Sequence, residues 1–303
     1  MRLYKIILFF VLLIGITSCK KDIEVSPNST FEGQLFIESI LIPGKLPRLF
    51  LSNSLPFFDS NVTPQEVFAR GASAIISSNS LTDFLAPDST FDKFRCRWVP
   101  FYKGSFPSQS GQTYDLLVTY RGKTYTATTT IDQPQVRIES VEYIEEFFDI
   151  YGGHDGVRIK FVDAPGPGNF YRFQMNRMMD KTRLHAHVLD VIKSDCTQDG
   201  EIFLTTDLGR IIFSDKNIDG QLLDLLLEVS FEYREGDTTY VFMQSLDKNS
   251  AEFFQDLDDQ LQSILNPFVE PVFLDTKIAG AIGVFGSAVL SDSVLFIYPQ
   301  NNP

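Results

Sequence analysis

The feature that most constrains the fold is a set of short runs in which every second side chain is apolar. The clearest pair occupies residues 113–131, where apolar and polar side chains alternate on both sides of Arg121-Gly122. Alternation that flanks a glycine-containing turn is typical of a β-hairpin. Similar runs recur along the chain with few helical patterns between them, so the sequence predicts a mainly β fold.

The strand runs divide into two β-rich domains. Residues 31–132 contain several short strands that end in this hairpin, and their spacing indicates a β-sandwich. A short linker follows. Residues 136–303 form the second predicted domain, in which a further hairpin is expected from residues 225–233 and 238–245.

One long amphipathic helix is expected in the second domain, near residues 250–265. Apolar side chains there fall at i, i+3 and i+4 positions, with Asp and Gln between them. Ser250 is a suitable N-cap, and Pro267 ends the pattern because the residue before a proline avoids the α region. We expect the apolar stripe to pack on the second sheet, with a partner-binding face as the alternative.

The N-terminal residues predict export and a membrane anchor. Residues 1–18 combine the basic Arg2 and Lys5, a short apolar run and small residues before Cys19, which is the order found in secretory signal peptides. The apolar run is too short to span a bilayer, which takes about 20 residues. A signal that ends on cysteine resembles the lipobox of bacterial lipoproteins, and this implies that Cys19 is the lipidated first residue of the mature chain.

Residues 19–30 are polar and are interpreted as a flexible tether. Acyl chains such as palmitate on Cys19 contribute about 0.8 kcal/mol per buried methylene, so several chains hold a folded domain firmly on a bilayer. A plain signal peptide with a chance cysteine, or an uncleaved anchor, is the alternative. The charged residues 20–24 resemble the signal that sends some lipoproteins to the outer face of the outer membrane.

Composition and charge exclude several classes of protein. Hydrophobic content of 44% with 21% charged residues is typical of a folded globular chain rather than a disordered one. The formal net charge of −13 argues against nucleic acids and against anionic lipid surfaces as ligands.

Two cysteines, Cys96 and Cys196, are left once Cys19 carries lipid. Outside the cytoplasm such a pair can oxidise to a bridge between the two halves of the chain. A disulfide needs its Cα atoms within about 7 Å, and nothing in the spacing shows that these residues meet. Separate thiols are therefore the favoured interpretation, with one bridge as the alternative.

Two groups of potential metal ligands are present, and neither completes a motif. His185 and His187 can share one face of a strand, but zinc needs three or four ligands, so we interpret them as solvated. Asp215 to Asp219 resembles the opening of a calcium loop, but Leu226 stands where the closing acid belongs. An ordinary turn rich in Asx hydrogen bonds fits the same residues, so we predict no metal and no cofactor, with calcium as the alternative.

The sequence shows no arrangement typical of catalysis. A Gly-x-Ser-x-Gly nucleophile motif is absent. Cys96 stands between Arg95 and Arg97, but neighbouring residues of a strand point to opposite faces, so these arginines would not activate its thiol. The acid pairs at residues 145–146 and 258–259 are interpreted as solvated surface. We therefore expect a protein that is not an enzyme.

The order of these elements resembles a family of bacteroidete-type outer-membrane lipoproteins known as domain of unknown function 4249. The resemblance rests on the lipobox, the helix and four further segments, at residues 114–127, 213–220, 266–271 and 280–286. The chain departs from the family pattern at residues 276–278 and at Ala281. The resemblance implies an immunoglobulin-like N-terminal domain, no established activity, and genes close to those of TonB-dependent transporters.

Together, these features predict a non-enzymatic outer-membrane lipoprotein that faces the cell exterior and binds a partner. The lipid bilayer is contacted through Cys19. The expected partner is an outer-membrane β-barrel, with the lipoprotein as an accessory to a TonB-dependent transporter. A stand-alone surface module for ligand binding or adhesion is the alternative, and a hydrolase is the third hypothesis.

Overall fold

The computed structural model describes residues 33–56, 63–79, 81–149, 152–179, 196, 201, 203–207, 212–227, 235–265 and 274–299. Contacts within the chain separate Met1–Glu32 from a single unit, Gly33–Pro303. Strands make up most of the described residues, so the predicted mainly β class is confirmed.

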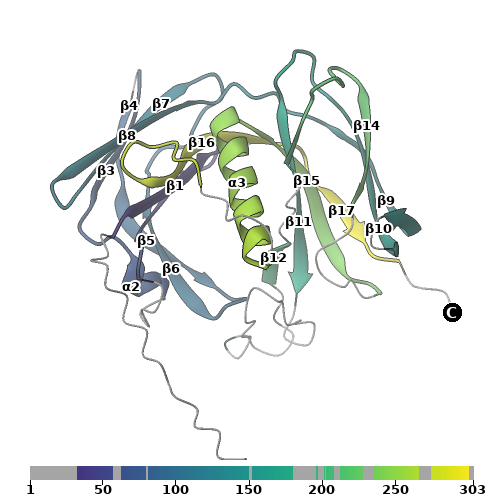
Figure 1. Ribbon diagram of the computed structural model, residues 1–303, viewed down its shortest axis with the longest axis horizontal. Coiled ribbons are helices and arrows are strands. Elements are labelled where there is room, and N and C mark those ends of the chain that lie inside the picture. The colour runs from purple at the N-terminus through teal and green to yellow at the C-terminus, as the bar shows by residue number, and fades with distance from the viewer. Residues whose placement is uncertain are drawn as a thin grey trace, which may run out of the picture. The chain divides into compact units, whose positions relative to one another are not determined.

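A ten-stranded sheet extends through the unit (Figure 1). Every pair in it is antiparallel except one, the parallel pair formed by β1 and β16. In spatial order its strands are β12 (Phe203–Asp207), β11 (Phe170–Met179), β15 (Thr238–Leu246), β16 (Ile282–Leu290), β1 (Leu35–Leu41), β2 (Arg48–Asn53), β6 (Arg97–Lys103) and β5 (Ala86–Asp92), with β13 (Ile212–Ser214) beside β11 and β17 (Val294–Ile297) beside β15.

The parallel pair explains one glycine of the run at residues 280–286. Gly283 of β16 has a φ of 127° and lies opposite Ile37 of β1, where an added Cβ would collide with the Ile37 backbone. Glycine is therefore required for the close approach of these two strands.

A four-stranded sheet covers one part of the ten-stranded sheet. It consists of β4 (Leu81–Phe84), β3 (Ser73–Ser78), β7 (Thr113–Tyr120) and β8 (Lys123–Thr130). Strands β7 and β8 form the predicted hairpin, with Arg121 and Gly122 at positive φ in the turn. Leu116 and Val118 of β7 are buried in a core with apolar side chains of β1 and β2, so the alternation marks the inward face as predicted.

A three-stranded sheet covers the other part. Its order is β14 (Leu222–Leu227), β10 (Gly152–Val162) and β9 (Ile138–Asp149). Buried side chains of β10 and β14 form a second core with those of β11, β15 and β17. The hairpin expected from residues 225–233 and 238–245 is wrong, because β14 pairs with β10 whereas β15 pairs with β11, β16 and β17.

Two helices are described, the single turn α2 (Pro64–Val67) and the longer α3 (Lys248–Leu265). Figure 1 shows α3 in front of the ten-stranded sheet, and Phe253 of α3 is buried against Phe36 of β1. The expectation that Ser250 is the N-cap is wrong, because α3 begins at Lys248 and Ser250 lies in its first turn. Instead, the carboxylate of Asp247 accepts hydrogen bonds from the Ser250 N–H (3.1 Å) and hydroxyl (2.5 Å).

The linker predicted between two domains joins β8 to β9. The ten-stranded sheet contains strands from both sides of this linker, with β1, β2, β5 and β6 before it and the rest after it. The division into residues 31–132 and 136–303 stays a prediction, and β16 pairs across it.

Candidate functional site

Several residues singled out from the sequence lie outside the described part of the chain. They are Cys19, the tether at residues 20–30, His185 and His187. Within the described residues, no helix has the length and apolar character needed to cross a bilayer. Lipidation of Cys19 therefore stays a prediction.

Cys96 and Cys196 are joined in a disulfide, with 5.6 Å between their Cα atoms. The favoured expectation of two separate thiols is wrong. Cys96 has a φ of 50° and lies in the turn between β5 and β6 rather than in a strand. Lys93 and Glu201 form an ion pair between the same two segments. The bridge fastens the β5–β6 turn to the chain between β11 and β12, and a disulfide sulfur cannot serve as a thiolate nucleophile.

The segment that resembles a calcium loop follows β13, and the fold brings a further carboxylate to it. Oxygen atoms of Asp163, Asp215 and Asp219 all lie within 4.8 Å of one another. Asp163 and Asp215 are 1% and 3% exposed, whereas Asp219 is exposed. Sequence reasoning misses Asp163, whose weak signal is a lone acid between a buried strand and the proline-glycine turn at residues 165–168.

Backbone N–H groups account for the orientation of two of these carboxylates. Asp215 accepts hydrogen bonds from the N–H groups of Gly168 and Asn169, at 2.9 Å and 3.0 Å. Asp219 accepts one from the N–H of Gly166 at 2.8 Å. These contacts join residues 46 to 53 positions apart and fasten the turn before β11 to the turn before β14, unlike the local hydrogen bonds of the Asx turns expected from the sequence.

Asp163 joins the end of β10 to the same turns. Its carboxylate accepts hydrogen bonds from the Gly220 N–H (2.8 Å) and from the Tyr171 hydroxyl. Burial and this contact with Asp163 raise the pKa of Tyr171 well above its ordinary value.

The three aspartates offer oxygen ligands of the kind that calcium prefers. Three carboxylates are nevertheless short of the six to eight oxygens that calcium takes. Each of them already accepts a hydrogen bond from backbone N–H, which compensates the burial of Asp163 and Asp215. The hydrogen bonds give this cluster, which we call the aspartate brace, a structural role.

The acid pair Glu145-Glu146 lies beside an open hollow of about 770 Å³ between β9 and β10. Next to it, Asp155 accepts hydrogen bonds from the hydroxyls of Tyr143 (3.1 Å) and Tyr298. Burial, followed by the contact with Asp155, raises the pKa of both tyrosines. The second acid pair is on α3, where Asp258 interacts with Arg172 of β11, whose pKa is lowered by burial.

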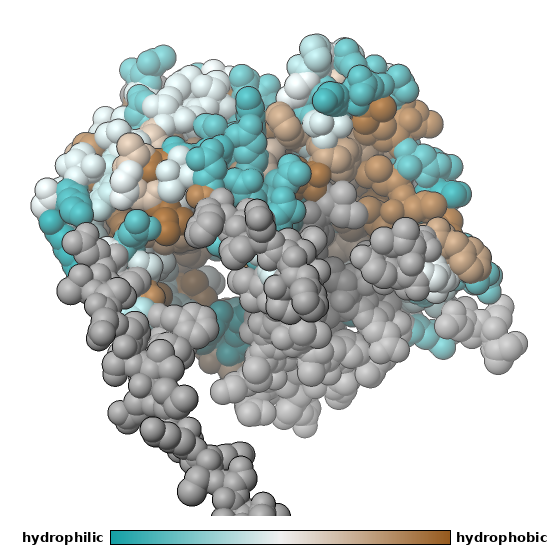
Figure 2. Space-filling view, viewed as in Figure 1, coloured by the Kyte–Doolittle hydropathy of each residue, from teal (hydrophilic) through white to brown (hydrophobic). Residues whose placement is uncertain are grey.

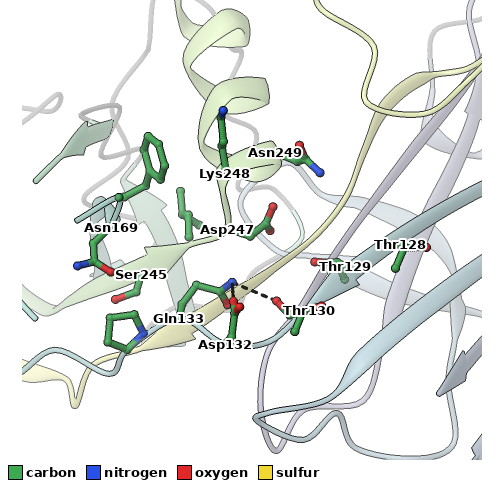
Figure 3. Close-up of a pocket in the computed structure, with 14 residues that line it drawn as sticks. Thr128, Thr129, Thr130, Asp132, Gln133, Asn169, Ser245, Asp247, Lys248 and Asn249 are labelled. Carbon is green, nitrogen blue, oxygen red and sulfur yellow. Dashed lines mark hydrogen bonds between the residues drawn. The ribbon is translucent and has the colours of Figure 1, made fainter. Parts of the chain in front are cut away.

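A polar cleft of about 430 Å³ lies where α3 begins (Figure 3). Its walls come from the end of β8, the linker to β9, the start of β11, the end of β15 and the first turn of α3. Hydroxyl, amide and carboxylate groups dominate the lining, among them those of Asp132, Gln133, Asn169, Ser245 and Asn249.

Internal hydrogen bonds hold the linker side of this cleft. The side-chain N–H of Gln133 donates to the Thr130 carbonyl (3.1 Å) and to Oδ1 of Asp132 (2.9 Å), as Figure 3 shows. The Ser287 hydroxyl lies 3.1 Å from the carbonyl oxygen of the Gln133 side chain. The linker wall of the cleft is therefore fixed in place without a ligand.

Apolar side chains gather on the surface over β14 and β17 (Figure 2). The first group, which we call the β14 group, consists of Val162, Leu222 and Leu226 on the outward face of the three-stranded sheet. The second, the β17 group, consists of Tyr240, Leu295 and Ile297 on the outward face of β15 and β17.

Comparison with known proteins gives one family. A family model described as a domain of unknown function, DUF4249, matches residues 20–292, which is nearly all of the chain that follows Cys19. No curated protein matches the chain. The order of motifs found in the sequence and this match agree, and the chain belongs to the DUF4249 family.

Proposed function

We propose that this protein is a non-enzymatic outer-membrane lipoprotein, anchored through Cys19 and facing the cell exterior. Its role is to bind an outer-membrane β-barrel protein as an accessory to a TonB-dependent transporter. The signal-like residues 1–18 that end at Cys19 support the anchor. We also propose an immunoglobulin-like sandwich in residues 31–132 and an amphipathic α3 that uses its apolar stripe to pack on the sheet.

The distribution of apolar side chains on β14 carries the partner proposal. Its sequence Leu-Leu-Asp-Leu-Leu-Leu is apolar at five of six positions, which is typical of a strand with both faces covered. Leu223 and Leu227 face the second core, but Leu222 and Leu226 are 59% and 41% exposed. Strand β17 repeats this pattern, with Phe296 buried and Leu295 and Ile297 exposed.

Clustered exposed apolar groups mark interaction surfaces more often than isolated ones do. Val162 lies directly opposite Leu222 in the β10–β14 pair, so these two side chains form one apolar contact area. A protein partner that covers this area completes the two-sided burial that the sequence pattern of β14 predicts.

The test is a mild-detergent pull-down of the full lipoprotein from outer membranes, read by mass spectrometry. We expect a β-barrel protein in near-stoichiometric amount. The double variant Leu222→Glu/Leu226→Glu should lose this partner while it stays in the outer membrane. Leu117→Glu is the matched control, since Leu117 is 39% exposed on β7 and lies outside both apolar groups.

The variant Cys19→Ala separates anchoring from contact. It should lose the partner through mislocalisation, which fractionation detects directly. If the wild-type lipoprotein is recovered alone, or if the double variant retains the partner, the proposed interface is wrong.

A further inference from the structure

The polar cleft contains a buried hydroxyl that its surroundings leave unsatisfied. Ser245 of β15 is 1% exposed, and its Oγ has no hydrogen-bond partner in the described part of the chain. Ser245 lines the cleft beside Asn169, as Figure 3 shows. A buried hydroxyl without a partner costs about 1–3 kcal/mol, and a polar atom bound beside it would relieve this cost.

Other polar groups of the cleft can form further hydrogen bonds. Oδ1 of Asp132 accepts from Gln133, and within the described part of the chain Oδ2 of the same carboxylate stays available. The side-chain N–H groups of Asn169 donate to the carbonyls of Ala164 and Gly166 and to the Asp215 carboxylate, which leaves the amide oxygen as an acceptor among the described residues. Lys248 and Asn249 begin α3, where the first N–H groups of a helix have no intrahelical acceptor.

The charges and hydrogen-bonding types of these groups restrict the class of ligand that the cleft can bind. The carboxylates of Asp132 and Asp247 line the cleft and disfavour an anion. The ammonium group of Lys248 forms an ion pair with Glu252, one turn further along α3. The lining offers hydrogen-bond donors and acceptors side by side, which suits hydroxyl groups, since each hydroxyl both donates and accepts. The volume of about 430 Å³ falls within the range of roughly 300–1,000 Å³ found for small-molecule sites.

We propose that this cleft binds a neutral polyhydroxylated ligand, a saccharide unit, with the Ser245 hydroxyl and the Asn249 side chain among its contacts. The site is separate from the β14 and β17 groups, so it adds a ligand to the proposed partner protein. Binding here does not depend on the partner, and the two proposals are tested independently.

The experiment presents the full lipoprotein, in a detergent without a sugar headgroup, to an array of neutral oligosaccharides and their sialylated counterparts. We expect selective binding to neutral members. Asn249→Ala, at an exposed position, should weaken this binding about tenfold, the factor that 1.4 kcal/mol represents. Gln109→Ala is the matched control, because Gln109 is an exposed amide outside the cleft.

Ser245→Ala distinguishes a ligand contact from a packing defect. Removal of an unsatisfied hydroxyl should leave the melting temperature of the free protein unchanged or raised. The same change should weaken saccharide binding by about tenfold if the hydroxyl contacts the ligand. Absence of neutral-saccharide binding, equal binding of sialylated members, or wild-type affinity in Ser245→Ala/Asn249→Ala would each overturn the proposal.

Discussion

The hairpin β7–β8 and the strand β14 distribute their apolar side chains in different ways. In β7, Tyr114, Leu116 and Val118 are buried, and every residue between them is exposed. Asp115 and Thr128 on the exposed face are joined by a hydrogen bond of 2.6 Å. In β14, the outward positions are apolar as well, apart from Asp224. Three of the four outward side chains of β7 are polar, whereas two of the three on β14 are apolar, so the outer face of β14 has the greater need of a partner that buries it.

Core substitutions should cause the largest losses of stability, and these losses should be equal in β7 and β14 because the inward faces of the two strands are equally buried. Leu116→Ala in β7 and Leu227→Ala in β14 each remove a side chain from a closed core. Each should lower the free energy of unfolding by about 2–5 kcal/mol, measured by denaturant titration. A loss below about 1 kcal/mol at Leu227 would mean that β14 is not packed as described.

Variants of the aspartate brace measure how much its hydrogen bonds, which hold the turn before β14, contribute to stability. Asp215→Asn keeps the shape of the side chain but weakens its hydrogen bonds from Gly168 and Asn169. We expect a loss of about 1–3 kcal/mol, with a smaller loss for the exposed Asp219→Asn. Since hydrogen bonds explain the brace, addition of calcium or of a chelator should leave the melting temperatures of the wild type and of Asp215→Asn unchanged. A calcium-dependent shift in wild type that Asp215→Asn removes would show a metal role instead.

Alkaline pH should weaken the second core through Tyr171. The folded-state pKa of this buried tyrosine is raised, so its contribution is complete below the unfolded pKa near 10 and is lost as the pH rises above that value. Tyr171→Phe removes two hydrogen bonds at neutral pH, the one that the hydroxyl donates to Asp163 and the one that it accepts from the Ala164 N–H, each worth about 0.5–1.5 kcal/mol. It should also reduce the loss between about pH 9 and pH 11. Denaturant titrations across this range, with wild type in parallel, measure the difference. Equal alkaline losses in the two proteins would contradict the assignment to Tyr171.

The smallest expected effect is on the stability of the surface variants. Leu226→Glu and Leu117→Glu both change exposed residues, so each should alter the free energy of unfolding by less than about 0.5 kcal/mol. Their effects on partner capture should nevertheless differ, with only Leu226→Glu reducing it. A large loss of stability in Leu226→Glu would show that its outward face is already covered within the chain.

The sequence predicts where strands form better than it predicts which strands pair with one another. The alternation around Arg121-Gly122 identifies β7 and β8 because the two strands pair through their own turn. The same reasoning pairs residues 225–233 with 238–245 wrongly, since adjacency along the chain does not reveal that β14 adds to β10. Hydrophobic period specifies which face of a strand is buried, and it carries no information on which strand lies beside it.

Long-range contacts explain the other differences. The disulfide joins residues 100 positions apart, and neither cysteine has a local feature that points to the other. Asp163 meets Asp215 only because β10 and the turn before β14 end at the same place. The cleft likewise combines a linker, the ends of β8 and β15, the start of β11 and the start of a helix, so its unsatisfied Ser245 has no sequence signal.

The most direct test of the central claim is site-specific photo-crosslinking in living cells, with p-benzoylphenylalanine placed at Leu222 in one protein and at Leu117 in another. Both side chains are exposed, Leu222 within the β14 group and Leu117 outside both the β14 and the β17 group. We predict a discrete crosslinked product with an outer-membrane β-barrel protein from position 222 and none from position 117. No product at position 222, or the same products from both positions, would contradict a partner on the outer face of β14.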